Sequence, residues 1–256
     1  MSGEAVDLVK KHLRESAIPM EFEAARILSA GGFEARQGRA YIGDSGPREI
    51  DILARMPPEI LGNDPIEALI GVSLVAECKR TADHPWIVLN ARTRVTPREV
   101  IAGAMATAQV QSALSPFTGP ETLDVPDFFG IDELHGFSIS VAGSKDRPAY
   151  DALAQVVSAA AGVTKTEFAW SFAWAVLVID GDLFSVDYKP DGEPKIDQVD
   201  RARLMWHGGP SRKPTPVDIV RITALDAYAS HAFRALRALQ TRLYFEVRKG
   251  RSDGSS

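Results

Sequence analysis

The feature of the sequence that most constrains the fold is an apolar run over residues 68–79, which ends in Glu77-Cys78-Lys79. Long apolar runs closed by polar residues are typical of strands that are buried for most of their length. Because residues two apart on a strand share a face, Glu77 and Lys79 point one way and Cys78 the other. The run predicts a buried strand with a charged pair at the edge of the core. A solvated ion pair is the simplest explanation of those two charges taken alone.

The segments around this run indicate a mixed α/β (α+β) domain. A hairpin is expected where residues 169–179 meet 183–188, across the strong turn dipeptide Asp180-Gly181. The chain is therefore expected to be a single domain, residues 1–256, with a central mixed β-sheet flanked by helices and a C-terminal β-hairpin and helix extension. Helices are predicted over residues 6–13, 19–30, 97–114, 148–161 and 225–244, and further strands over 33–42, 48–56, 86–89, 136–141 and 217–222.

Composition places the chain among globular proteins. Hydrophobic residues make up 45% and charged residues 25% of its 256 residues. Cys78 is the single cysteine, which excludes an internal disulfide and favours a reducing compartment such as the cytoplasm. The longest apolar stretch is far shorter than the roughly 20 residues of a membrane span, and the charged N-terminus is unlike a secretory signal. We therefore expect a cytoplasmic protein without a membrane partner.

The formal net charge of −5, taken alone, argues against a simple electrostatic binder of nucleic acid. Residues 115–135 contain five acids and no Lys or Arg, however, so the rest of the chain sums to zero. The glycine-rich nucleotide loops, the hydrolase elbow G-x-S-x-G and the zinc motif H-E-x-x-H are all absent from the sequence. Dinucleotide-binding, P-loop, hydrolase-elbow and zinc-protease functions are therefore not indicated.

Asp51 is the second residue that indicates chemistry. It stands between Ile50 and Ile52 on the strand expected before the Glu77 strand, so its carboxylate points away from the face of the isoleucines. Antiparallel neighbours can bring side chains within about 5 Å of each other. An Asp, a Glu and a Lys gathered there would suit Mg²⁺, which prefers a few carboxylates plus waters at about 2.1 Å. A strand-edge or turn position is the simpler explanation of Asp51 alone.

The third element is the helix expected from Pro19, which has Glu21 and Glu23 in its first turn. A favourable contact with the helix N-terminus accounts for both acids. Glu21 nevertheless shares a face with the apolar residues of the helix and can reach inward at the edge of the sheet. Glu23 lies on another side of the helix, and we expect it to be solvated.

Taken together, these residues resemble the PD-(D/E)XK, or restriction-endonuclease-like, nuclease superfamily, nearest its Mrr and Holliday-junction-resolvase-like branches. Those families place a helix Glu eleven residues before a Gly and twelve before an aromatic residue, as Glu21, Gly32 and Phe33 are placed here. An acidic-aliphatic pair on the second strand follows, here Asp51-Ile52, and then E-x-K on the third. The resemblance implies a core over about residues 18–163 and a C-terminal elaboration over about 165–250. The proline of the family name is missing, because Ile50 precedes Asp51.

The resemblance implies a Mg²⁺-dependent endonuclease that hydrolyses phosphodiester bonds of nucleic acid, with DNA as the expected substrate and Mn²⁺ as a substitute ion. Asp51, Glu77 and the main-chain carbonyl of Cys78 would bind the metal, which acidifies a water and neutralises phosphate charge. Lys79 would hold or help deprotonate the attacking water and stabilise the transition state. Glu21 would orient a water or contribute to a second ion.

A nuclease also needs residues that grip phosphates. His84 follows the E-x-K strand at the expected rim of the site, and three arginines lie just beyond it, Arg92, Arg94 and Arg98. A loop histidine is more often structurally incidental. Cutting both strands of a duplex usually takes two sites, which is compatible with a homodimer.

Two other interpretations of the sequence remain. One keeps the fold without the chemistry: a catalytically silent, nuclease-like module that binds nucleic acid or a protein. The other is an unrelated α/β protein that matches by chance, in which Asp51 and Glu77 would lie more than about 8 Å apart, too far to share one Mg²⁺.

Overall fold

The centre of the protein is a parallel pair of strands, β3 (Ile70–Lys79) and β7 (Trp170–Ile179). They pair over their full length, from Ile70 beside Trp170 to Lys79 beside Ile179. Both strands are buried along nearly all of this length, as expected for parallel strands with helices on both faces. The predicted buried strand is thereby confirmed from residue 70 onward. The computed structural model describes residues 3–43, 46–57, 70–81, 84–91, 95–114, 126–129, 135–144, 148–166, 170–188, 192–208 and 213–252.

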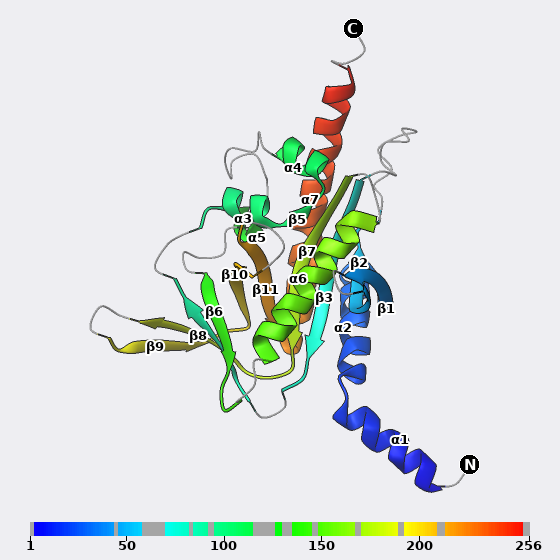
Figure 1. Ribbon diagram of the computed structural model, residues 1–256, viewed down its shortest axis with the longest axis vertical. Coiled ribbons are helices and arrows are strands. Elements are labelled where there is room, and N and C mark those ends of the chain that lie inside the picture. The colour runs from blue at the N-terminus through cyan, green and yellow to red at the C-terminus, as the bar shows by residue number, and fades with distance from the viewer. Residues whose placement is uncertain are drawn as a thin grey trace.

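The described strands form one mixed sheet in the order β1-β2-β3-β7-β11-β10-β6-β4-β8-β9, with β5 beside β7 (Figure 1). The pairs β1–β2, β2–β3, β10–β11 and β8–β9 are antiparallel, whereas β11 is parallel to β7. The predicted central mixed sheet is confirmed. The remaining strands are β1 (Glu34–Gly43), β2 (Gly46–Arg55), β4 (Trp86–Asn90), β5 (Met105–Ala106), β6 (Gly136–Val141), β8 (Leu183–Tyr188), β9 (Pro194–Gln198), β10 (Arg201–Trp206) and β11 (Thr215–Arg221).

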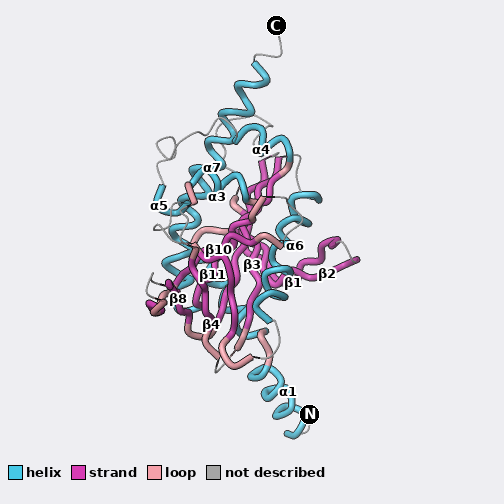
Figure 2. Tube along the Cα trace, turned by 60° about the vertical axis from the view of Figure 1, so that its left-hand side comes forward, coloured by secondary structure: helices cyan, strands magenta, loops and turns pink. Residues whose placement is uncertain are grey.

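Helices cover both faces of this sheet (Figures 1 and 2). α2 (Ile18–Ala30) and α7 (Leu225–Ser252) form one core with residues such as Ala76 and Cys78 of β3. α6 (Pro148–Thr166) forms a second core with Val75 and with β7 residues on the other face. The flanking helices predicted from the sequence are therefore present. The other helices are α1 (Gly3–Glu15), α3 (Pro97–Gly103), α4 (Ala108–Leu114), α5 (Pro126–Phe129) and a short 3₁₀ turn (Ile222–Ala224).

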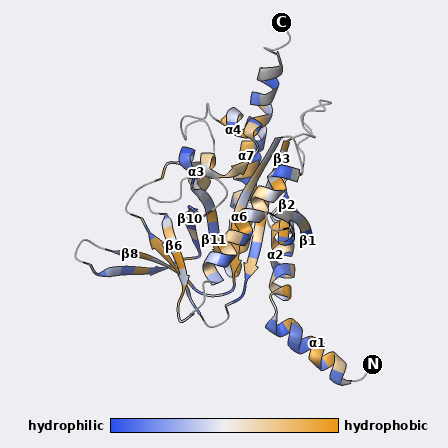
Figure 3. Ribbon diagram, viewed as in Figure 1, coloured by the Kyte–Doolittle hydropathy of each residue, from blue (hydrophilic) through white to orange (hydrophobic). Residues whose placement is uncertain are grey.

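α1 contacts α2 and projects from the rest of the protein (Figure 1). Polar and apolar residues alternate along it (Figure 3). Among the described residues, no helix is both long and apolar enough to cross a membrane.

The single helix predicted over residues 97–114 is wrong, because the segment is broken into α3, β5 and α4. Ala104 is extended, with φ −64° and ψ 154°, and the next residue, Met105, pairs with Ala173 of β7. Gly103 lies so close to β11 that a Cβ atom there would be 2.2 Å from the carbonyl oxygen of Pro214. Packing against the sheet thus overrides the local helical preference of the segment.

The predicted C-terminal hairpin is also wrong, although both of its strands form. β7 lies between β3 and β11, whereas β8 pairs with β4 and β9. The physical reason is burial: β7 is apolar on both faces and fits the centre of the sheet, while β8 is only partly buried. Asp180, in the turn after β7, accepts a hydrogen bond from the Thr81 N–H at 2.9 Å and so ties the turn to the end of β3. The core expected from the sequence covers residues 18–163. It leaves out β7, which is the strand that pairs with β3.

A buried charge cluster joins β7, β10, β11 and α7. Asp218 is fully buried and accepts hydrogen bonds from Arg203 at 2.7 Å, Arg201 at 2.8 Å, and Trp174 and Tyr228 at 2.9 Å. Arg203 also donates to two backbone carbonyls of α5. Burial favours the neutral acid, but the two arginines outweigh it and hold the pKa of Asp218 well below its usual range.

Replacing Asp218 should therefore destabilise the fold strongly. Asp218→Ala leaves the guanidinium of Arg203, which is 3% exposed, without its counter-ion. We expect a loss of about 3–5 kcal/mol in the free energy of unfolding, measured by urea denaturation at neutral pH. Asp200→Ala is the matched control, since Asp200 is 70% exposed in its ion pair with Arg221 and should lose less than about 1 kcal/mol. Equal losses in the two variants would contradict the buried-cluster interpretation.

Candidate active site

The candidate site lies at the carboxyl end of β3, where the apolar run ends. Glu77 and Lys79 share one face of the strand, and Lys79 Nζ donates to Glu77 Oε1 at 2.7 Å. The Glu77 side chain is 8% exposed and that of Lys79 is 31% exposed. A solvated ion pair was the simplest explanation of E-x-K alone. This explanation is wrong, because Glu77 is buried.

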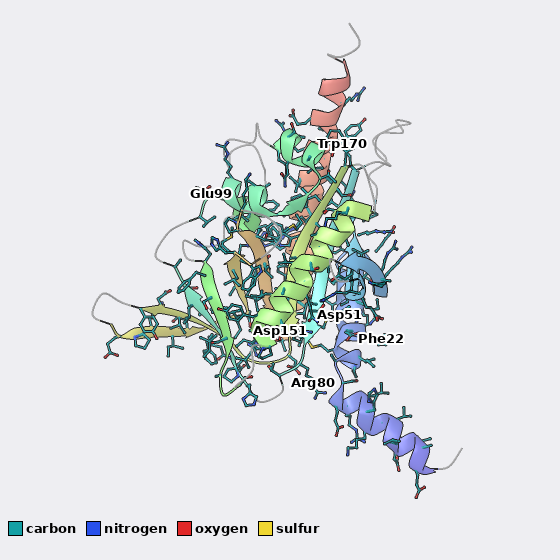
Figure 4. The ribbon with its side chains drawn as sticks, viewed as in Figure 1. Phe22, Asp51, Arg80, Glu99, Asp151 and Trp170 are labelled. Atoms are coloured by element: carbon teal, nitrogen blue, oxygen red, sulfur yellow. The ribbon has the colours of Figure 1, made fainter. Side chains whose placement is uncertain are left out.

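Asp51 lies directly beside this pair on β2. The antiparallel register joins Ile52 to Ala76, which places Asp51 opposite Glu77 one step further along. Asp51 Oδ2 accepts a hydrogen bond of 2.8 Å from the Cys78 backbone N–H. Figure 4 shows Asp51 beside the lower half of the sheet and Arg80 below it. Asp51 and Glu77 are therefore close enough for the charge of Asp51 to act on Glu77.

Glu21 reaches the same place from the first turn of α2. Its neighbours Met20 and Ala24 are packed in the core, which holds the helix against the sheet and leaves Glu21 partly buried at the edge. Burial, together with the negative charges of Asp51 and Glu49, raises the pKa of Glu21. Glu23 is instead exposed and paired with Arg26 at 2.7 Å, so the prediction that it is solvated is confirmed.

Glu49 is an acid of this cluster that the sequence reasoning missed. It lies two residues before Asp51, hence on the same face of β2, and its charge raises the pKa of both Asp51 and Glu21. The β1 residue facing this stretch is Gly38, with a φ of +61°. A Cβ atom on Gly38 would lie 2.8 Å from Glu49 Oε1, so a glycine leaves room for the carboxylate. Strand alternation alone was the signal that could have identified Glu49.

The site holds more negative than positive charge, and its acids are partly buried from solvent. Burial, and then the charge of Asp51, raises the pKa of Glu77 to about 7, even though Lys79 opposes the shift. Burial also raises the pKa of Asp51, against the hydrogen bond from Cys78. Several carboxylates thus share a single lysine, and an added cation would relieve their repulsion.

The donor set fits a hard divalent cation. Asp51 and Glu77 each use one oxygen in the hydrogen bonds described above, and each carboxylate has a second oxygen. The Cys78 carbonyl points to the same strand edge as its N–H, toward β2, while the Cys78 side chain is buried in the core. No three His, Cys, Asp or Glu side chains of the described segments converge to hold a metal by themselves. Two carboxylates, a carbonyl and waters match the ligands that Mg²⁺ accepts.

The predicted phosphate-gripping residues are not all brought to this site. His84 is exposed in the turn after β3, where its N–H donates to the Thr81 carbonyl at 3.0 Å, so it lies at the same end of the sheet. Arg98 is exposed on α3, which packs against the beginning of β11, at the opposite end. Figure 4 places its neighbour Glu99 far from Asp51. Arg92 and Arg94 lie outside the described residues.

No model of a known protein family matches the chain, and neither curated proteins nor solved structures give a match. The function of the protein is therefore inferred from its residues and their geometry. Within that geometry, Glu21, Asp51, Glu77 and Lys79 come together from three separate elements, α2, β2 and β3.

The raised pKa of Glu77 predicts a specific pH dependence of stability. Because its pKa of about 7 exceeds the ordinary 4.5, Glu77 stabilises the fold fully below pH 4.5, and that contribution is lost as the pH rises through 7. Between pH 5 and 8, the free energy of unfolding of the natural protein should fall by about 2–3 kcal/mol relative to Glu77→Gln. Urea denaturation in the presence of a chelator measures this difference.

Glu23→Gln is the control for this experiment, because the pKa of exposed Glu23 is lowered by its bond with Arg26. Its stability relative to the natural protein should stay flat between about pH 5 and 8. A flat difference for Glu77→Gln as well would show that Glu77 is ionised throughout this range.

Proposed function

We propose that this protein is a metal-dependent nuclease that hydrolyses phosphodiester bonds of nucleic acid, with DNA as its substrate. The observation that carries the proposal is the meeting of Asp51, Glu77 and Lys79 at the end of β3, with Asp51 bonded to the Cys78 N–H. A merely structural role would favour pairing each acid with its own cation, whereas here the acids outnumber the lysine.

The order of elements is compatible with the proposal. A helix that carries Glu21 precedes three antiparallel strands, and a later helix, α6, leads to β7, which is parallel to β3. This arrangement agrees with the central mixed sheet and flanking helices that the resemblance to the PD-(D/E)XK nucleases implies. The E-x-K segment lies at the carboxyl end of β3.

In the proposed reaction, a bound Mg²⁺ or Mn²⁺ supplies positive charge for the scissile phosphate and acidifies water. Asp51, Glu77 and the Cys78 carbonyl hold the cation. Lys79 exchanges its bond with Glu77 for one with the attacking water or the phosphate, and so stabilises the negative charge of the transition state. Glu21 orients the water from α2. The resemblance to the PD-(D/E)XK nucleases implies products that carry a 5′-phosphate and a 3′-hydroxyl. The buried free thiol of Cys78 suits a reducing cytoplasmic location.

The silent nuclease-like module remains the alternative function. It shares the fold and differs in chemistry, so binding of metal without cleavage would favour it. The retention of Lys79 beside the two acids favours the enzyme, because binding alone does not need a lysine that neutralises part of the site.

Removal of the Lys79 amine tests the catalytic proposal. Lys79→Ala should reduce Mg²⁺-dependent cleavage by at least about 100-fold, because the transition state loses a charged donor. The assay uses plasmid, linear, single-stranded, branched and RNA substrates with Mg²⁺ or Mn²⁺. Lys165→Ala, an exposed lysine in the last turn of α6, is the control and should cut normally. Full activity in Lys79→Ala would exclude the proposed role.

Metal binding is tested separately from cleavage by thermal unfolding. At a Mg²⁺ concentration about ten times its dissociation constant, the natural protein should gain about 1.4 kcal/mol, or about 3–5 °C in Tm. Asp51→Asn should lose most of this gain, because a neutral amide replaces a charged ligand. Asp7→Asn changes an exposed acid of α1 and should keep it. An equal gain in all three proteins would place the cation elsewhere.

A further inference from the structure

The β8–β9 hairpin ends the sheet on the side away from β1 and extends from the rest of the protein (Figure 1). Within the described sheet, β8 is the sole strand neighbour of β9. The outer edge of β9 therefore offers backbone C=O groups and, except at Pro194, N–H groups to a further strand. An edge of this kind can accept a strand from another protein molecule by extending the sheet.

One face of this hairpin carries exposed apolar residues on β9 and at the end of β8, although Val186 on the same face is 7% exposed. Ile196 lies opposite Val186 and is 59% exposed, and Tyr188 lies opposite Pro194 and is 57% exposed. Facing residues of an antiparallel pair share a face of the sheet. The edge therefore combines open backbone groups with an apolar surface that a partner strand could cover.

The charged residues of β9 favour a second copy of the same strand as its partner. Lys195 and Asp197 flank Ile196 on the other face, half exposed, and form an ion pair of 2.6 Å. If a second copy of β9 runs antiparallel with Ile196 facing its equivalent, Lys195 of each chain lies opposite Asp197 of the other. The strand is thus complementary to itself in charge, and a two-fold axis at Ile196 satisfies both pairs at once.

The other edge of the sheet lacks this property. In β1, Gly38 has a φ of +61°, which distorts the middle of the strand. Of its charged residues, Glu34 and Arg36 are symmetric about Ala35, but Ala35 is the second residue of the strand, so pairing centred there would join few residues. Charge symmetry about the middle residue of the strand is therefore a feature of β9 and not of β1.

We propose that β9 is the contact through which two copies of this chain associate, by antiparallel pairing centred on Ile196. The dimer is isologous, and the sheet continues from one copy into the other. The interface is small, so the association is weak and reversible. This inference does not depend on the proposed nuclease function, because none of its residues belongs to the candidate active site.

Charge reversal gives a sharp test, read by sedimentation velocity over a concentration series. Lys195→Asp makes the strand wholly negative at the two positions and Asp197→Lys makes it wholly positive, so each variant alone faces like charges across the axis. Each should show a dimer dissociation constant raised at least about tenfold. An equimolar mixture of the two variants should associate as the natural protein does, because every facing pair is again opposite in charge.

The double variant Lys195→Asp with Asp197→Lys should also dimerise, since it exchanges the charges without losing complementarity. Ile196→Asp should be monomeric, because it places two carboxylates against each other at the axis. Circular dichroism of every variant confirms that the fold is kept. A natural protein that stays monomeric up to about 0.5 mM, single variants that dimerise normally, or a mixture that fails to associate would each overturn the proposal.

Discussion

The pairing of β3 with β7 is the constraint on which the rest of the structure depends. Both strands are apolar on both faces, so each must have strand neighbours on its edges and helices above and below. α6 meets this need on one face, and α2 with α7 meets it on the other. The apolar run of β3 ends at Glu77, and the candidate site lies where that covering ends. The position of the site is therefore a consequence of where hydrophobic burial stops.

The same burial gives the acids of the site their unusual properties. Glu77 is 6% exposed and has the charge of Asp51 close by, so its ionised form is disfavoured in spite of Lys79. A protein selected for stability alone would replace such a carboxylate with an apolar residue, because the lysine offsets only part of the cost. A cation that binds there recovers this free energy. Under the proposed function, the site exchanges local stability for affinity toward a cation.

The sequence predicted what depends on local alternation and missed what depends on tertiary contacts. The faces of Glu77, Lys79 and Asp51 follow from the strand period of two, and the structure places these residues accordingly. Asp180-Gly181 suggested a hairpin because a turn dipeptide is read locally, whereas the position of β7 is decided by neighbours distant in sequence. β10 escaped prediction because Arg203 interrupts its apolar pattern, and the acid that makes this arginine tolerable lies on β11. Glu49 was missed although alternation sufficed to place it beside Asp51.

The fold contains two buried acids, Asp218 and Glu77, whose pKa values are shifted in opposite directions. The first has a structural role, and the second belongs to the candidate site. Asp218 is surrounded by Arg201, Arg203, Trp174 and Tyr228, all of which donate to it, and its pKa is lowered. Its charge is fully satisfied within the protein, so it has no capacity left for a ligand. Glu77 is also buried, and burial together with the charge of Asp51 raises its pKa to about 7, because Lys79 opposes only part of the shift. A carboxylate that lacks enough positive partners within the protein can bind a cation from solution. By this criterion the acids at the end of β3, and not the cluster around Asp218, are the candidate functional centre.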